Sequence, residues 1–175
     1  MTTHSSSVSA DVIDAVVGLT PDNPLHATRH ARAKVAAATQ GSYDLFFDPE
    51  YKGDFSVQER LLVAYYACLL SKSQDLGRHY HQALLDLRTD ASVLQALASH
   101  QTGQLDSKRL KALLLFTQKL IERPVDGDQA ALKALQAAGM ATPDIVTLAQ
   151  LIAFLSYQLR LTAGLQAMKA LEAQP

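Results

Sequence analysis

The residues best suited to chemistry gather in one stretch of the chain, from Ser56 to Leu85. This stretch carries a glutamate near its start, then a long apolar run with a cysteine, and then a serine, a tyrosine and two histidines. Side chains of these types exchange protons or attack electrophiles when a pocket brings them within hydrogen-bond reach of a substrate. The candidate site residues are therefore Glu59, Cys68, Ser73, His79, Tyr80 and His81.

Two kinds of reaction could use these side chains. The first is general acid-base chemistry, with His79 or His81 acting together with Glu59. The second is nucleophilic chemistry, because Ser73, Asp75 and His79 are the residue types of a hydrolytic triad, although triads are recognised by geometry and not by short spacing. The two histidines lie ~200° apart around a helix that turns 100° per residue, so they cannot bind one metal ion from the same face.

Cys68 and Glu59 each have a structural and a chemical interpretation. Cys68 is the single cysteine of the sequence and lies within Leu61–Leu70, LLVAYYACLL, a run that is typical of a helix buried in a core. A thiol there is expected to be buried with a raised pKa, and the alternative is a single-cysteine peroxidatic role. Glu59 can close a capping box with Ser56, and the alternative is a proton relay.

His26 and His30 have the i, i+4 spacing of two metal ligands on one helix face. The segment from His26 to Lys34 contains no acidic residue, and within it Arg29, Arg32 and Lys34 add positive charge. We therefore interpret this face as a solvated basic surface and expect no metal site. Because no glycine-rich phosphate loop and no zinc pattern is present either, the sequence indicates no cofactor.

Hydrophobic periodicity predicts an all-α fold of about seven or eight helices, with no competing strand pattern. Ser9 is expected to cap a first short helix that Gly18 ends, and a second helix is expected over residues 24–43. A last helix over 142–171 is apolar on more than one side, which indicates a subunit interface. The other helices are expected at about 56–71, 79–87, 92–98, 108–121 and 129–138.

Composition limits the possible partners and compartments. The 175 residues fit one domain, expected at 10–173 after a flexible N-terminus of residues 1–9. The formal net charge of -1 favours neither nucleic acid nor an anionic membrane as a partner. No segment is expected to span a membrane, and the first ten residues lack the regions of a secretory signal. We therefore expect a cytoplasmic protein.

Several segments together resemble the carboxymuconolactone decarboxylase / alkylhydroperoxidase-D-like (AhpD-like) family, over about Asp11 to Met168. In the central stretch, Phe55–Arg60 (FSVQER) matches the entry to the family's core helix, and His79–Leu85 (HYHQALL) matches the helix that follows. The C-terminal half matches through the run Ala137–Val146 (AAGMATPDIV) and its continuation over 153–165. The resemblance implies an AhpD-like helical bundle.

The peroxidase members of this family carry the pattern E-R-E-x11-C-x-x-C-x-x-H-H, which supplies two thiols and a Glu/His proton relay. When the pattern is anchored on Glu59 and Arg60, the first histidine falls on His79. The second glutamate, both cysteines and the second histidine are replaced in this chain by Leu61, Ser73, Leu76 and Tyr80. Because reduction of a peroxide by this route needs an attacking thiolate and a resolving thiol, the resemblance implies a member without two-thiol peroxidase chemistry.

The leading hypothesis is a homo-oligomer (dimer, trimer or hexamer, as the resemblance implies) that is non-catalytic or holds a small-molecule ligand in a pocket. One alternative is a cysteine-independent, decarboxylase-like enzyme that uses His79 or His81 with Glu59. The other is a single-cysteine antioxidant protein that uses Cys68.

Overall fold

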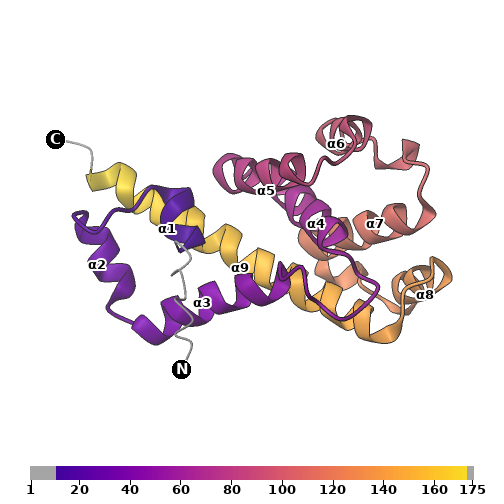
Figure 1. The fold of residues 1–175 in the computed structure, drawn as a ribbon, viewed down its shortest axis with the longest axis horizontal. Helices are drawn as coiled ribbons and strands as arrows, with labels where there is room; N and C mark the ends of the chain where they lie inside the picture. Colours follow the sequence, from indigo (N-terminus) through magenta and orange to yellow (C-terminus); the bar gives the residue numbers. More distant parts are fainter. Residues whose placement is uncertain (1–10, 173–175) are drawn as a thin grey trace, which may run out of the picture.

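A computed structural model describes residues 11–172, which form helices and connecting loops without any strand (Figure 1). The predicted all-α fold is thereby confirmed. In chain order the helices are α1 (Val12–Val17), α2 (Pro24–His30), α3 (Ala33–Phe46), α4 (Val57–Leu70), α5 (Gln74–Asp86), α6 (Ala91–Ala98), α7 (Lys108–Glu122), α8 (Gln129–Ala137) and α9 (Thr142–Glu172), with short 3-10 turns at Thr102–Gln104 and Pro124–Asp126.

Helix α4 is the centre of the fold, and α5, α7 and α9 pack around it. Its N-terminus has the predicted capping box, in which the Ser56 hydroxyl accepts from the Glu59 amide and the Glu59 carboxylate accepts from the Ser56 amide. Every residue from 60 to 68 is buried, which agrees with an apolar run that has no polar face.

The connection from α4 to α5 is a tight turn built on backbone hydrogen bonds. The Ser73 amide donates to the Cys68 carbonyl at 2.9 Å, and the Lys72 amide donates to the Leu69 carbonyl at 3.1 Å. This is a Schellman arrangement, which places the residue after the C-cap in the left-handed region. Lys72 occupies that position with φ of 55°, where glycine would be the less strained residue.

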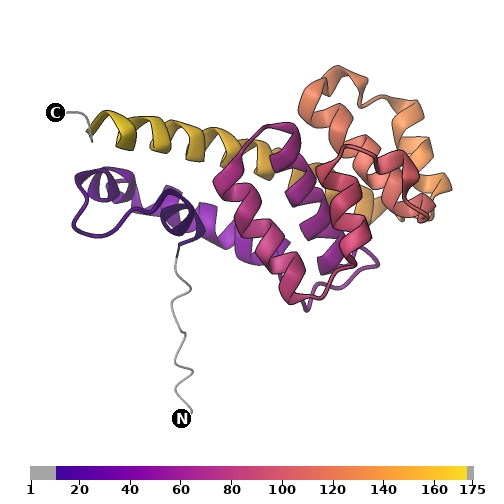
Figure 2. The same cartoon turned by 90° about the horizontal axis from the view of Figure 1, so that it is seen from above.

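Helix α9 belongs to two cores. Its first half packs into the main core through Leu148, Leu151, Ile152 and Leu155. Its second half extends away from that bundle and is accompanied by α1 and α2 (Figure 2). Leu165 joins a second, smaller apolar cluster there, which also contains Val12, Ile13, Val17, Leu19 and Leu25.

The length of α9 corrects one expectation. Among the described residues, α9 is long and apolar enough to cross a membrane by length and composition, whereas the sequence was expected to hold no such segment. The core helix of a soluble protein passes the same test. In this structure 44% of that apolar window is buried, and α9 packs there against α4 and α7.

Two local predictions in the N-terminal region are wrong. The expected helix over 24–43 is two helices, because the backbone leaves the helical region at Arg32 (φ -104°, ψ 64°). Different partners hold the two pieces: Arg29 of α2 binds α1, whereas Tyr43 of α3 binds α5. The cap of α1 is Asp11, whose carboxylate accepts from the amides of residues 13 and 14, and the predicted cap Ser9 lies outside the described residues.

Candidate functional site

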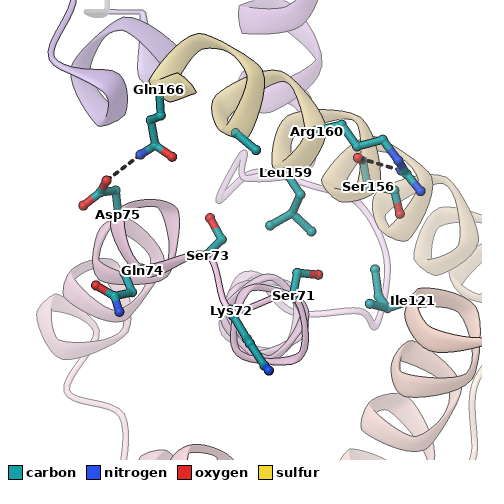
Figure 3. Close-up of a pocket in the computed structure, with 11 residues that line it drawn as sticks. Ser71, Lys72, Ser73, Gln74, Asp75, Ile121, Ser156, Leu159, Arg160 and Gln166 are labelled. Carbon is teal, nitrogen blue, oxygen red and sulfur yellow. Dashed lines mark hydrogen bonds between the residues drawn. The ribbon is translucent and has the colours of Figure 1, made fainter. Parts of the chain in front are cut away.

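A cleft of about 520 Å³ opens where α4 ends and α5 begins, within the stretch from Ser56 to Leu85 that holds the candidate residues. The α4–α5 turn and the start of α5 form one wall, and α9 forms the other (Figure 3). In this view the Ser73 hydroxyl projects into the space between the two walls. The residues that line the cleft are Ser71, Lys72, Ser73, Gln74, Asp75, Ile121, Ser156, Leu159, Arg160, Ala163 and Gln166.

The charges around the cleft favour a negatively charged ligand. Lys72 and Arg160 are exposed at its edge, and Arg160 Nη1 donates to the Ser156 carbonyl at 2.8 Å. The carboxylate of Asp75 is occupied by hydrogen bonds from Gln166 and Arg78. The lining therefore contains two cations, Lys72 and Arg160, and one carboxylate that is already paired.

The N-terminus of α5 adds a third favourable feature. Ser73 is its N-cap residue, but the Ser73 side chain accepts no hydrogen bond from the first turn. The first amides of a helix have no partner within the helix, and the helix dipole makes this end attractive to anions. These amides and the Ser73 hydroxyl are consequently available at the wall of the cleft.

Ser73 also borders a second hollow, of about 330 Å³, on the other side of the turn. His81 lines this hollow and packs its ring against Tyr65, with 5.1 Å between ring centroids. The structure therefore brings Ser73 together with Asp75 in the cleft and with His81 in the hollow.

His79 is directed elsewhere, because its Nε2 lies 2.8 Å from the hydroxyl of Tyr43 on α3. Burial lowers the pKa of His79, so its imidazole is kept in the neutral form. Burial also raises the pKa of Tyr43 to about 12, with a smaller contribution from Asp44. His79 lines neither the cleft nor the hollow, so Ser73, Asp75 and His79 do not form a triad around either space.

Tyr80 is fully buried and donates its hydroxyl hydrogen to Oε1 of Gln158 on α9. Its pKa is raised well above the usual tyrosine value, first by burial. Among the described residues, Nε2 of Gln158 has no hydrogen-bond partner, so Tyr80 supplies the hydrogen bond that the Gln158 side chain makes. This buried hydrogen bond links α5 to α9 within the core.

Glu59 lies at the opposite end of α4 from the cleft. Besides closing the capping box, its carboxylate accepts from Nε of Arg109 at 2.7 Å. A helix of 14 residues is about 21 Å long at ~1.5 Å per residue, which separates Glu59 from Ser73. Glu59 is thus bonded to structural partners and does not line the cleft.

Cys68 is only 1% exposed and is packed against Gly77, where an added Cβ would lie 3.5 Å from the cysteine's own Cβ. Burial raises the pKa of its thiol well above the ordinary value. A nucleophilic cysteine needs the opposite, an accessible thiol with a lowered pKa. The expectation of a buried thiol with a raised pKa is therefore confirmed.

One interpretation of the N-terminal region has to be corrected. The sequence was taken to place no acidic residue near His26 and His30, but folding brings Asp14 of α1 beside both of them. Arg29, counted among the cations that disfavour a metal, is held by Asp11 and Asp14. The face is therefore not simply a solvated basic surface.

Sequence reasoning missed the part of the site that α9 supplies. Ser156, Arg160 and Gln166 follow the turn at 71–75 by about eighty or more positions, and no local pattern links the two segments. Lys72 could have been identified from the sequence, because it lies in the segment predicted to end α4.

A scan against models of protein families finds no match, and neither does a search of curated proteins. Among solved structures, the chain is similar to an uncharacterized peroxidase-related protein from Silicibacter sp. TM1040, with a TM-score of 0.67 and 20% identity. The similarity covers 75% of this chain and 68% of that protein. The chain therefore has the AhpD-like helical fold.

Proposed function

We propose that this chain is a divergent member of the AhpD-like family that binds a small organic anion in the cleft between α5 and α9. The observation that carries the proposal is the combination, at one cleft, of Lys72, Arg160 and the N-terminus of α5 without a side-chain cap. The resemblance places the family's thiol pair at Ser73 and Leu76, so the cleft adjoins the former peroxidase centre. A volume of about 520 Å³ suits a small ligand.

This proposal excludes two-thiol peroxide reduction by the chain itself. Ser73 supplies a hydroxyl where the resemblance places the first thiol, and a hydroxyl is a poor nucleophile unless a base activates it. The single cysteine is buried in α4, with its thiol held in the protonated form. Non-catalytic ligand binding is consistent with both facts.

The proposal can be tested by titrating the protein with succinate, benzoate and inorganic phosphate while recording amide chemical shifts. We expect saturable shifts at residues 73–76 and 156–166, and at least a fivefold weaker affinity in Arg160→Ala. Arg123→Ala, which removes a cation outside the lining of the cleft, is the matched control. Shifts spread over the whole surface, or equal affinity in the two variants, would contradict the proposal.

A second candidate is acid-base catalysis, for which the structure favours His81 over His79. His81 shares a hollow with Ser73, whereas His79 is bonded to Tyr43 and Glu59 is bonded to Arg109. Turnover of a carboxylate substrate would decide between binding and catalysis: loss in His81→Ala with retention in His79→Phe supports this candidate.

We also propose that the chain is a cytoplasmic homo-oligomer. Large apolar side chains are exposed on α9 and on α3, and burial between subunits would remove them from water. They are Val35, Leu45, Val146, Tyr157, Met168 and Leu171. Light scattering after size-exclusion chromatography is expected to give a multiple of the 19.0 kDa chain mass, reduced in a Met168→Glu/Leu171→Glu variant. A monomer in the unsubstituted protein would contradict this.

A further inference from the structure

Three side chains on α1 and α2 place metal-ligand atoms together at a distance from the cleft. Asp14 comes from α1, and His26 and His30 come from successive turns of α2. One ligand atom from each lies within 4.8 Å of the other two. We propose that these residues bind a divalent first-row transition metal ion, with Zn²⁺ as the expected ion.

The interatomic distances are close to those that a metal would impose. Zn²⁺ binds imidazole nitrogen and carboxylate oxygen at ~2.0–2.2 Å, so two ligands of a tetrahedral ion lie about 3.4 Å apart. Asp14 Oδ2 is 3.6 Å from His26 Nε2 and 2.7 Å from His30 Nε2. A small widening of the second distance, by about 0.7 Å, accommodates the ion.

Arg29 orients the carboxylate without consuming its ligand atom. Its Nη1 donates to Oδ1 of Asp14 at 2.8 Å, and its Nη2 donates to Asp11 at 3.0 Å. The other oxygen of Asp14, Oδ2, is the one directed at the two histidines. A hydrogen bond that holds a ligand in place from behind is a common feature of metal sites.

The charge of the cluster also favours a cation. Two carboxylates (Asp11 and Asp14) face one guanidinium, which leaves one negative charge uncompensated when both histidines are neutral. Arg29 Nη1 lies 2.9 Å from His30 Nε2, and this contact has to lengthen as the ion enters. Arg32 and Lys34, the other cations of this segment, are exposed beyond the end of α2.

Binding would fasten α2 to α1 and leave one coordination position free. The three side chains are 13%, 25% and 32% exposed, in the order Asp14, His26 and His30, so the site is open to solvent on one side. Three protein ligands with an open fourth position are typical of sites that keep a water molecule. The small core beneath, formed by α1, α2 and the end of α9, would be held more firmly.

The test is titration of the full chain, freed of metal with a chelator, with Zn²⁺ in a calorimeter and with Co²⁺ in a spectrophotometer. We expect one equivalent of Zn²⁺ to bind, a visible Co²⁺ absorption typical of tetrahedral coordination, and a higher melting temperature with Zn²⁺. His26→Gln and His30→Gln are each expected to weaken binding at least tenfold. His81→Gln, a histidine outside the cluster, is expected to leave it unchanged.

Asp14→Asn provides a second readout that does not depend on a histidine. It keeps the size of the side chain and removes the ligand charge, so we expect at least tenfold weaker binding in a protein whose circular dichroism still shows the native helix content. Absence of saturable binding, or binding that survives His26→Gln/His30→Gln, would overturn the proposal.

Discussion

His79 Nε2 lies 2.8 Å from the hydroxyl of Tyr43, which joins α5 to α3 and turns this imidazole away from Ser73. The family resemblance made His79, together with Glu59, a surviving member of a proton relay. In the structure it is a half-buried, neutral side chain with a structural partner. The chain therefore shares its fold with a peroxidase-related protein. The hydrogen bond to Tyr43, however, gives His79 a structural role and not a role in the proton relay of a thiol peroxidase.

The first prediction concerns pH. Burial holds the pKa of His79 in the folded state below 6.5, so in acid the unfolded chain takes up a proton before the folded chain does. The contribution of neutral, buried His79 to the free energy of unfolding is complete above pH 6.5 and is lost as the pH falls below that value. Urea denaturation between pH 7.5 and 5 should show a shallower decline in His79→Phe than in the unsubstituted protein. An equal decline would contradict a depressed pKa.

The second prediction separates stability from binding at Lys72. Lys72→Gly removes both a cation at the cleft and the strain of a non-glycine residue in the left-handed region, so unfolding should cost about 1 kcal/mol more while affinity for anions falls. Arg88→Gly is the matched control, because Arg88 has the same φ of 55° at the far end of α5. It should gain similar stability and keep full affinity. Equal binding loss in both variants would contradict the assigned cleft.

The third prediction concerns the buried hydrogen bond between Tyr80 and Gln158. Tyr80→Phe leaves the buried amide oxygen of Gln158 without its donor, and an unsatisfied buried polar group costs about 1–3 kcal/mol. Tyr157→Phe, which removes a hydrogen bond to Thr39 from a more exposed tyrosine, should cost less. Chemical denaturation measures both values, and the reverse order would argue against a buried polar link between α5 and α9.

The fourth prediction concerns the thiol. Because Cys68 is buried in α4 and its pKa is raised, a maleimide or disulfide reagent should label the native protein very slowly. Labelling should become rapid only at urea concentrations that unfold the chain. Fast labelling of the native protein would show that the thiol is accessible.

Much of the fold could be predicted because the sequence patterns that define its helices are local. The capping box at Ser56 and Glu59 fixes the start of α4, and the apolar run after it indicates burial on every side. Gly18, which was expected to end the first helix, follows α1 with φ of 68°. Each of these features depends on neighbours a few positions away in the chain.

The features that the sequence did not predict depend on contacts between distant segments. The break at Arg32 arises because α2 is held by α1 while α3 is held by α5 and α9. In the same way, Asp14 reaches His26 and His30 only after α2 folds back on α1. Periodicity identifies helices but does not state which of them meet, so the cluster and the α9 wall of the cleft were missed.

The central claim is that this fold operates here without thiol peroxidase chemistry. Its most direct test is consumption of hydrogen peroxide and an organic hydroperoxide in the presence of a dithiol donor, comparing the unsubstituted protein with Cys68→Ala. We predict no consumption above the rate without protein in either case. Catalytic turnover that disappears in Cys68→Ala would contradict the account.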